Sequence, residues 1–201
     1  MTAFATPKAW AAQAAHTTPF RIPNEFYPTP PEATRALLSV EAFDGDIWEP
    51  ACGNGQISKV LADHGHTVVS TDLHAYGVGV SGVDFPKQDA ARARHIVTNP
   101  PYGYGLADRF VEHALALTRQ TDGKVAMLLN MKSLCHPSRT AFWTRVPPAR
   151  IYAVDDIVCW PDCEYGPPPG YFTRHRYCWA VWAPGHTGRP SFWWLSGRDF
   201  R

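Results

Sequence analysis

The chain has 201 residues, enough for one well-packed domain and too few for two. Hydrophobic residues make up 45% of it and charged residues 18%, a balance that excludes general disorder. The net charge is only +1, but residues 1–86 carry four Lys or Arg against nine Asp or Glu, whereas residues 87–201 carry 15 against nine. Such asymmetry is typical either of a face that meets a polyanion or of an unevenly charged solvated surface, and both interpretations stay open.

No segment has the pattern of a secreted or membrane protein. Residues 1–20 lack a basic start followed by an apolar core, and no apolar run approaches the roughly 18 residues of a membrane span. The five cysteines fit no disulfide framework; Cys159, Cys163, His175 and Cys178 would allow a zinc site, but their spacing matches no strong finger pattern. We therefore expect a reduced, cytoplasmic protein with no metal and no membrane partner.

Helix and strand signals alternate along the chain. Residues 1–28 are expected to form an arm or lid, and Thr29 the N-cap of a first helix, because two prolines and an acidic residue follow it. Strands are expected at 46–49, 67–71, 95–98, 125–129, 151–155 and 177–182, and further helices at 57–64, 107–119 and 136–145. This alternation predicts an α/β fold, a parallel sheet with helices on both faces.

Polar groups follow two of the expected strands at the edge where an open parallel sheet binds its ligands. Glu49–Gly55 is a Gly-containing turn between a strand and a helix, where a ligand can approach the backbone and free N–H groups closely. Asp72 ends the next strand, and its carboxylate could accept both hydroxyls of a ribose or simply cap a helix. The glycine spacing matches neither the dinucleotide pattern nor a P-loop, which disfavours a nicotinamide enzyme.

The third strand end is the most distinctive, because Asn99-Pro100-Pro101-Tyr102 follows it. Prolines have no N–H to donate, so the Asn99 amide oxygen and the Pro100 carbonyl are left as rigid acceptors beside an aromatic ring. Two acceptors and a flat apolar surface suit a planar amine. A rigid turn capped by a tyrosine is the alternative interpretation.

Four blocks resemble, in the expected order, the class I S-adenosylmethionine-dependent amino-methyltransferases, in particular small bacterial and phage DNA adenine N6-methyltransferases: Tyr27–Pro30, Trp48–Gly55, Asp84-Phe85 and Thr98–Tyr102. The resemblance covers roughly residues 27–183. It implies a Rossmann-like class I methyltransferase fold with a mostly parallel seven-stranded sheet, a methyltransferase domain at 29–183, and a basic, aromatic C-terminal tail at 184–201 packed on that domain. The chain leaves no room for the separate target-recognition domain that the DNA enzymes usually carry, so we expect low sequence specificity.

The resemblance also implies S-adenosyl-L-methionine as the cofactor. Its methionine end would lie against Thr29-Pro30 and the Ala51–Gly55 turn, Asp72 would bind the ribose, Asp84 would bind the adenine amino group, and Phe85 would pack near the adenine ring. The complete set of implied cofactor residues is Tyr27, Thr29, Pro30, Glu49, Pro50, Ala51, Cys52, Gly53, Gly55, Asp72, Leu73, Asp84, Phe85 and Asn99.

The implied reaction is methylation of the exocyclic N6 amine of adenine in DNA. The implied catalytic residues are Asn99, Pro100, Pro101 and Tyr102. The first two would pull the N–H bonds of the amine out of the ring plane and expose its lone pair, while Tyr102 stacks on the base. A base in a duplex would have to be flipped out, or supplied single-stranded. The expected substrate contacts are Tyr102, Tyr165, Tyr171, Phe172, Arg174 and Arg176.

Two kinds of alternative stay open. An RNA adenine or a protein glutamine could be the substrate, although the Thr29-Pro30 block disfavours the glutamine branch. A binding module that keeps the cofactor site but has lost methyl transfer is the alternative outside the enzymes. The expected partner is DNA, including single-stranded DNA, or RNA, and the expected state is a monomer or a weak homodimer.

Overall fold

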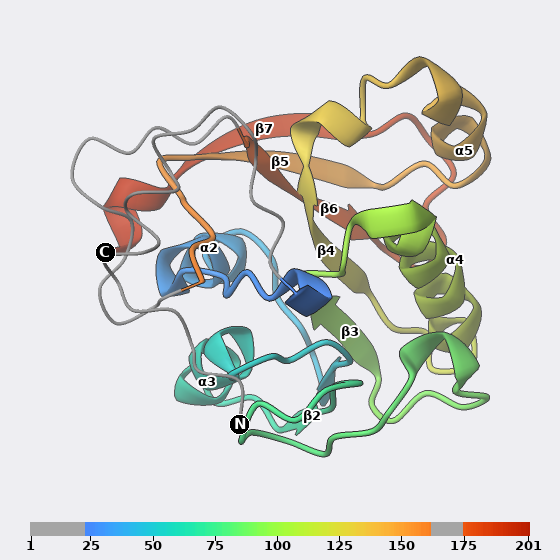
Figure 1. The fold of residues 1–201 in the computed structure, drawn as a ribbon. Helices are drawn as coiled ribbons and strands as arrows, with labels where there is room; N and C mark the ends of the chain where they lie inside the picture. Colours follow the sequence, from blue (N-terminus) through green and yellow to red (C-terminus); the bar gives the residue numbers. More distant parts are fainter. Residues whose placement is uncertain (1–22, 162–174) are drawn as a thin grey trace.

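A computed structural model describes residues 23–161 and 175–201, which form a seven-stranded sheet with helices on both faces (Figure 1). The strand order is β2-β1-β3-β4-β6-β5-β7. Only β6 runs antiparallel to its neighbours, and every other pair of adjacent strands is parallel. The mostly parallel seven-stranded α/β sheet that we expected is therefore confirmed.

The bounds of most elements lie within two residues of the expected ones. The strands are β1 (Ile47–Glu49), β2 (Val68–Ser70), β3 (His95–Thr98), β4 (Val125–Asn130), β5 (Arg150–Asp155), β6 (Tyr177–Trp182) and β7 (Ser191–Ser196). The α-helices are α2 (Pro31–Leu38), α3 (Gln56–Asp63), α4 (Leu106–Thr118) and α5 (Thr140–Arg145). Short 3-10 turns are η1 (Pro23–Glu25), η2 (Phe85–Lys87), η3 (Gly103–Gly105), η4 (Met131–Ser133), η5 (Pro137–Arg139) and η6 (Gly197–Phe200). The start of the expected helix at 136–145 is this separate turn η5.

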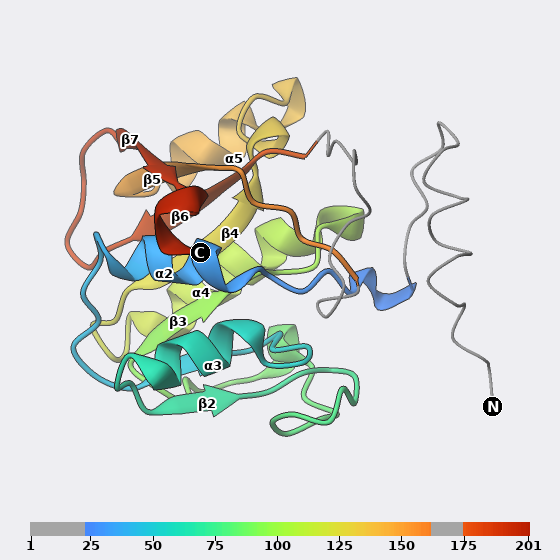
Figure 2. The ribbon, with the colours of Figure 1, turned by 90° about the vertical axis from the view of Figure 1, so that its left-hand side faces the viewer.

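The sheet divides the apolar core into two layers. Helices α2 and α3 cover one face, which Figure 2 shows from the front, and α4 covers the other. Along β3, Val97 packs in the layer of Ala36 and Leu37, whereas Ile96 packs in the layer of Val111. Because both faces are covered, every residue of β3 is buried and β4 is apolar from Val125 to Leu129, with no alternation of apolar and polar residues. Packing on both faces therefore stabilises the sheet, and the polar turns follow its strands at the carboxyl edge.

The segment expected as a tail contains a strand that the sequence analysis missed. Strand β7 pairs in parallel with β5 along its whole length, so residues 184–201 contribute the outermost strand of the sheet. Its Trp193 and Trp194 are 58% and 78% exposed. An edge strand that is open on both faces needs no regular alternation of apolar and polar residues, so the aromatic run of β7 gave no strand signal.

A buried ion cluster lies at the amino edge of the sheet. The Glu41 carboxylate, 4% exposed, accepts hydrogen bonds from Arg150, Lys124 and Tyr152. Burial acts to raise the pKa of Glu41, but these bonds outweigh it and hold the pKa below its ordinary value. Lys124 immediately precedes β4 and Arg150 begins β5, so the cluster fastens the edge opposite the polar turns and is structural.

Candidate functional site

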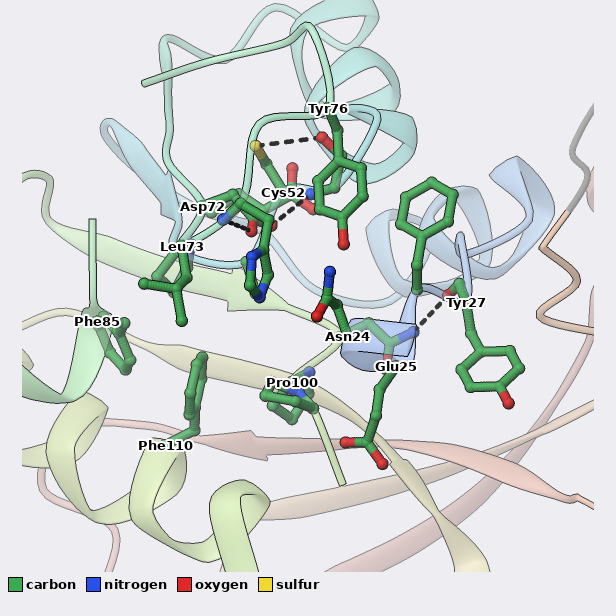
Figure 3. Close-up of a pocket in the computed structure, with 18 of the residues that line it drawn as sticks. Asn24, Glu25, Tyr27, Cys52, Asp72, Leu73, Tyr76, Phe85, Pro100 and Phe110 are labelled. Carbon is green, nitrogen blue, oxygen red and sulfur yellow. Dashed lines mark hydrogen bonds between the residues drawn. The ribbon is translucent and has the colours of Figure 1, made fainter. Parts of the chain in front are cut away.

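A cavity of about 550 Å³ opens at the carboxyl ends of β1, β2 and β3 (Figure 3). This volume is typical of small-molecule sites. The expected site residues that line it are Tyr27, Thr29, Glu49, Pro50, Ala51, Cys52, Gly53, Asp72, Leu73, Asp84, Phe85, Asn99, Pro100, Pro101 and Tyr102. The fold thus brings all four sequence blocks to one cavity.

Three of the expected site residues do not line the cavity, and four others are outside the described residues. Pro30, Gly55 and Arg176 do not line the cavity. Pro30 is the N-cap residue of α2, and Arg176 immediately precedes β6. Tyr165, Tyr171, Phe172 and Arg174 are outside the residues that the structure describes.

Thr29 is not the N-cap that we expected. Helix α2 begins at Pro31, and Pro30 occupies the cap position without a side-chain hydrogen bond. Pro31 disfavours helical backbone angles at the residue before it, so Pro30 is extended, with a ψ of 141°, and the helix begins one residue later than expected. The Thr29 hydroxyl is thereby released from capping and accepts a hydrogen bond from Asn99 Nδ2 at 3.0 Å.

Gly55 shapes the turn after β1 and does not face the cavity. Its φ is +82°, in the left-handed region, and an added Cβ would lie 2.8 Å from a methyl carbon of Val78. Gly55 is the N-cap residue of α3, and Gly65 follows the other end of that helix. Gly65 has a φ of +89° and open space around it. The left-handed φ and the nearby Val78 therefore require a glycine at position 55 for the backbone conformation.

Gly55→Ala should lower the free energy of unfolding by about 2–3 kcal/mol, whereas Gly65→Ala should lower it by about 1 kcal/mol. Both variants force an alanine into the left-handed region, but only the first also pushes against Val78. Chemical denaturation of the two variants measures the difference. Equal losses would show that the Val78 contact relaxes without cost.

A buried carboxyl group stands at the end of β1. Glu49 is 1% exposed and accepts a hydrogen bond from Ser58, whose Oγ lies 2.6 Å from Ser70 Oγ. Burial raises the pKa of Glu49 from 4.5 to about 8; the Ser58 hydrogen bonds oppose this rise, and the nearby Asp72 carboxylate adds to it. The Glu49 side chain is therefore mostly protonated at neutral pH, and a cation in the cavity would favour its ionised form.

Asp72 braces two turns of the cavity wall. Its Oδ2 accepts from the Gly53 N–H at 2.9 Å and its Oδ1 from the His74 N–H at 2.8 Å. Each carboxylate oxygen can accept a second hydrogen bond, so the brace leaves capacity for ligand hydroxyls. The neighbouring Leu73 is 51% exposed, an apolar side chain on the cavity wall.

The wall near η2 combines an acceptor with aromatic surface. Phe85 is buried between Trp48 and Phe110, with ring centroids 5.1 and 4.8 Å away. In Figure 3, Leu73, Phe85 and Phe110 lie on the same side of the cavity. Asp84, directly before Phe85, forms an ion pair with Lys87 at 2.9 Å. The arrangement offers a flat apolar surface beside a carboxylate, as an aromatic amine requires.

The Asn99 turn is held by a hydrogen-bond network. Asn99 Nδ2 donates to Thr29 Oγ1 at 3.0 Å and lies 3.3 Å from the Tyr27 carbonyl oxygen. Asn99 Oδ1 accepts from the Tyr102 hydroxyl at 2.6 Å, and that hydroxyl also lies 2.9 Å from the Leu128 carbonyl oxygen. Burial holds the pKa of Tyr102 well above its usual range, so the hydroxyl keeps its proton. Stacking of its ring on a base stays a prediction.

A strap formed by residues 24–28 lines the cavity; these residues were expected in the arm or lid, and of them only Tyr27 was expected among the cofactor residues. Phe26 stacks on Tyr76, with ring centroids 4.4 Å apart and an interplanar angle of 15°. Glu25 accepts a hydrogen bond from the Gly103 N–H at 2.7 Å, and both Asn24 and Glu25 have positive φ angles. Such backbone conformations persist only where the surroundings hold them. No periodic signal marks these contacts, because they join segments about 50 to 80 residues apart in the sequence.

Residues 23–161 and 175–201 contain neither a candidate metal cluster nor a candidate membrane-spanning helix. No group of three or more His, Cys, Asp or Glu could hold a metal ion there, and Cys163 of the zinc alternative is not among those residues. No helix in the same two segments is long and apolar enough to cross a membrane.

Comparison with solved structures identifies the fold. The chain is similar to a protein from Vibrio vulnificus assigned as the modification subunit of a type I restriction enzyme, with TM-score 0.58 and 13% identity over 94% of this chain and 49% of that one. It is also similar to a protein from Listeria monocytogenes assigned as a class I S-adenosylmethionine-dependent methyltransferase, with TM-score 0.53 and 10% identity over 94% and 71% of the two chains. A protein from Pyrococcus horikoshii assigned as an RNA methyltransferase matches with TM-score 0.56 and 12% identity over 89% and 99%.

The protein therefore has the Rossmann-like fold of the class I methyltransferases. It spans about half the length of the Vibrio protein that it matches. No protein-family model matches the chain.

Proposed function

We propose that the protein is an S-adenosylmethionine-dependent methyltransferase that methylates the N6 amine of adenine in DNA, with low sequence specificity. The observation that carries this proposal is the Asn99 turn, which opens into the same cavity as the ends of β1 and β2. A cofactor site and a pair of amine acceptors thus share one space. The fold supports methyl transfer as the reaction class, and the turn supports an amine as the acceptor.

The cavity residues fit the proposed cofactor in charge, size and shape. Glu49 is a buried carboxyl that a cation would ionise, and S-adenosylmethionine carries an ammonium and a sulfonium group. Asp72 and Asp84 are acceptors for its hydroxyl and amino groups, and Leu73 and Phe85 are apolar surface for its adenine. When bound, this cofactor supplies an electrophilic methyl group, so the chain itself has only to bind and orient the two reactants.

The amine is oriented by acceptors, not by a charged base. Asn99 Oδ1 and the Pro100 carbonyl would each accept one N–H of the target amine, which exposes the nitrogen lone pair. Positioning of this kind can contribute about 7–11 kcal/mol to rate acceleration. The proton of the methylated amine can then leave to water.

DNA is favoured over RNA by two observations. The Thr29-Pro30 block favours the DNA-modifying branch of the family that the chain resembles, and the Vibrio protein of the same fold is assigned as the modification subunit of a type I restriction enzyme. RNA adenine is the second candidate because the Pyrococcus protein is assigned as an RNA methyltransferase. A flipped adenine presents the same amine in either nucleic acid.

The test is incubation with methyl-labelled S-adenosylmethionine and unmethylated DNA, RNA or protein, followed by digestion and identification of the labelled product. N6-methyladenine from DNA, spread over many sequence contexts, is the expected result. N6-methyladenine from RNA alone would select the second candidate. Label on a carbon, on a hydroxyl or on glutamine would reject both, and a single long recognition sequence would reject low specificity.

Asp72→Ala should weaken cofactor binding by about 1–3 kcal/mol, through loss of charged hydrogen bonds to the ribose and of the brace on Gly53 and His74. Calorimetric titration with S-adenosylmethionine measures the change. The matched control is Asp89→Ala, an exposed aspartate outside the cavity lining, which should bind as the unmodified protein does. Unchanged affinity of Asp72→Ala would remove Asp72 from the ribose role.

A further inference from the structure

The amide of Asn99 has two ends of nearly the same shape but opposite chemistry. Its oxygen accepts hydrogen bonds and its nitrogen donates them, so only the oxygen can hold the hydrogens of a target amine. A flipped amide would present two N–H bonds to the amine and repel it. Neighbouring hydrogen-bonding groups must therefore fix which end of the Asn99 amide faces the substrate. This requirement rests on the proposed function.

The strap and Thr29, the residue directly after it, provide acceptors on one side of the amide. The Tyr27 carbonyl can only accept hydrogen bonds, and it lies 3.3 Å from Asn99 Nδ2. Thr29 Oγ1 lies 3.0 Å from the same nitrogen, and Thr29 itself is 3% exposed, so water cannot easily replace its hydroxyl. Both amide hydrogens thus have an acceptor, one in the strap and one in Thr29. A flip would place Asn99 Oδ1 against the Tyr27 carbonyl oxygen, two acceptors with no hydrogen between them.

Tyr102 favours the same orientation from the other side. Its hydroxyl donates to Asn99 Oδ1 at 2.6 Å, yet it has a second acceptor, the Leu128 carbonyl, at 2.9 Å. The hydroxyl carries one hydrogen, so it can turn from Asn99 to Leu128 without leaving that hydrogen unpaired. The amide oxygen can then accept from an arriving amine.

From this geometry we infer that Thr29, with the Tyr27 carbonyl, orients the Asn99 amide so that its oxygen faces the target amine. Thr29 is then a positioning residue for methyl transfer, acting through Asn99. The sequence resemblance had placed Thr29 only at the methionine end of the cofactor.

Thr29→Val removes the hydroxyl but keeps the shape, and Thr29→Ser keeps the hydroxyl. At saturating cofactor, Thr29→Val should lower kcat about 5- to 10-fold, the equivalent of one net hydrogen bond, and Thr29→Ser should restore most of it. Thr34→Val is the matched control, because the Thr34 hydroxyl is buried without a hydrogen-bond partner in the described part of the chain and does not line the cavity. It should leave kcat unchanged. A weaker affinity of Thr29→Val for the cofactor, with kcat intact, would overturn the inference.

A second measurement does not depend on turnover. In a protein with ¹⁵N-labelled asparagine, the side-chain signals of Asn99, identified by their loss in Asn99→Asp, should show two hydrogens protected from exchange with water. Thr29→Val should remove the protection of one of them. Fast exchange of both hydrogens in the unmodified protein would overturn the inference even if the enzyme is active. Protection without methylation of any nucleic acid would reject the proposed function and leave the orientation established.

Discussion

Replacing Asn99 by alanine should lower turnover about 10²- to 10³-fold and leave cofactor affinity almost unchanged. The reason is that the substitution removes an acceptor aimed at the reacting amine, a loss typically worth about 3–4 kcal/mol in the transition state. The two prolines still fix the backbone of the turn, and the Tyr102 hydroxyl keeps the Leu128 carbonyl as its acceptor. The fold should therefore survive. Methylation rates at saturating cofactor and calorimetric cofactor titration measure the two quantities.

Asn130→Ala is the matched control for this result. Asn130 ends β4, the strand next to β3, and hydrogen-bonds His175 at 2.7 Å, but it does not line the cavity. A general disturbance of the sheet edge would slow both variants alike. Asn99→Ala activity at the unmodified rate would mean that the prolines and Tyr102 form only a turn.

Much of the fold could be predicted because burial leaves a plain pattern in the sequence. Ile96 and Val97 of β3 and residues 125–129 of β4 are consecutive apolar residues since both faces of the sheet are covered, Asn99 directly follows β3, and Asn130 ends β4. Strand β7 was not predicted, because a strand at the edge of the sheet needs no regular alternation of apolar and polar residues. Its aromatic side chains are exposed, so nothing in their order distinguishes a strand from a tail.

The candidate site also has one part that could be predicted from the sequence and one part that could not. Glu49, Asp72 and Asn99 stand at strand ends, and parallel strands bring their carboxyl ends to one edge, so their meeting in a cavity could be predicted. The strap could not be predicted, because the stacking of Phe26 on Tyr76 is a contact between two loops that are far apart in the sequence. The hydrogen bond that Asn99 donates to Thr29 could not be predicted either, since a threonine before two prolines is equally typical of a helix cap.

The contribution of Glu49 to the stability of the protein should fall as pH rises from about 5 to about 8, and Glu49→Gln should remove that fall. The pKa of Glu49 is about 8 in the folded protein against 4.5 ordinarily, so the folded state binds more protons than the unfolded state within this window. The stability that the protonated carboxyl provides is complete below about pH 4.5 and is lost by about pH 8. With about 1.4 kcal/mol per pKa unit, the change can reach about 5 kcal/mol. Urea denaturation across this pH range measures it.

Glutamine keeps the size of Glu49 and its acceptor for Ser58 but cannot ionise, so the difference between the two stability curves isolates Glu49. Glu112→Gln is the control, since Glu112 is 42% exposed and paired with Arg145. Parallel curves for Glu49→Gln and the unmodified protein would show that Glu49 is already ionised. The same carboxyl links protonation to the proposed cofactor: a cationic ligand should ionise Glu49 and release up to about one proton at pH 7. Calorimetry in buffers of different ionisation enthalpy would detect that proton, and Glu49→Gln should abolish it.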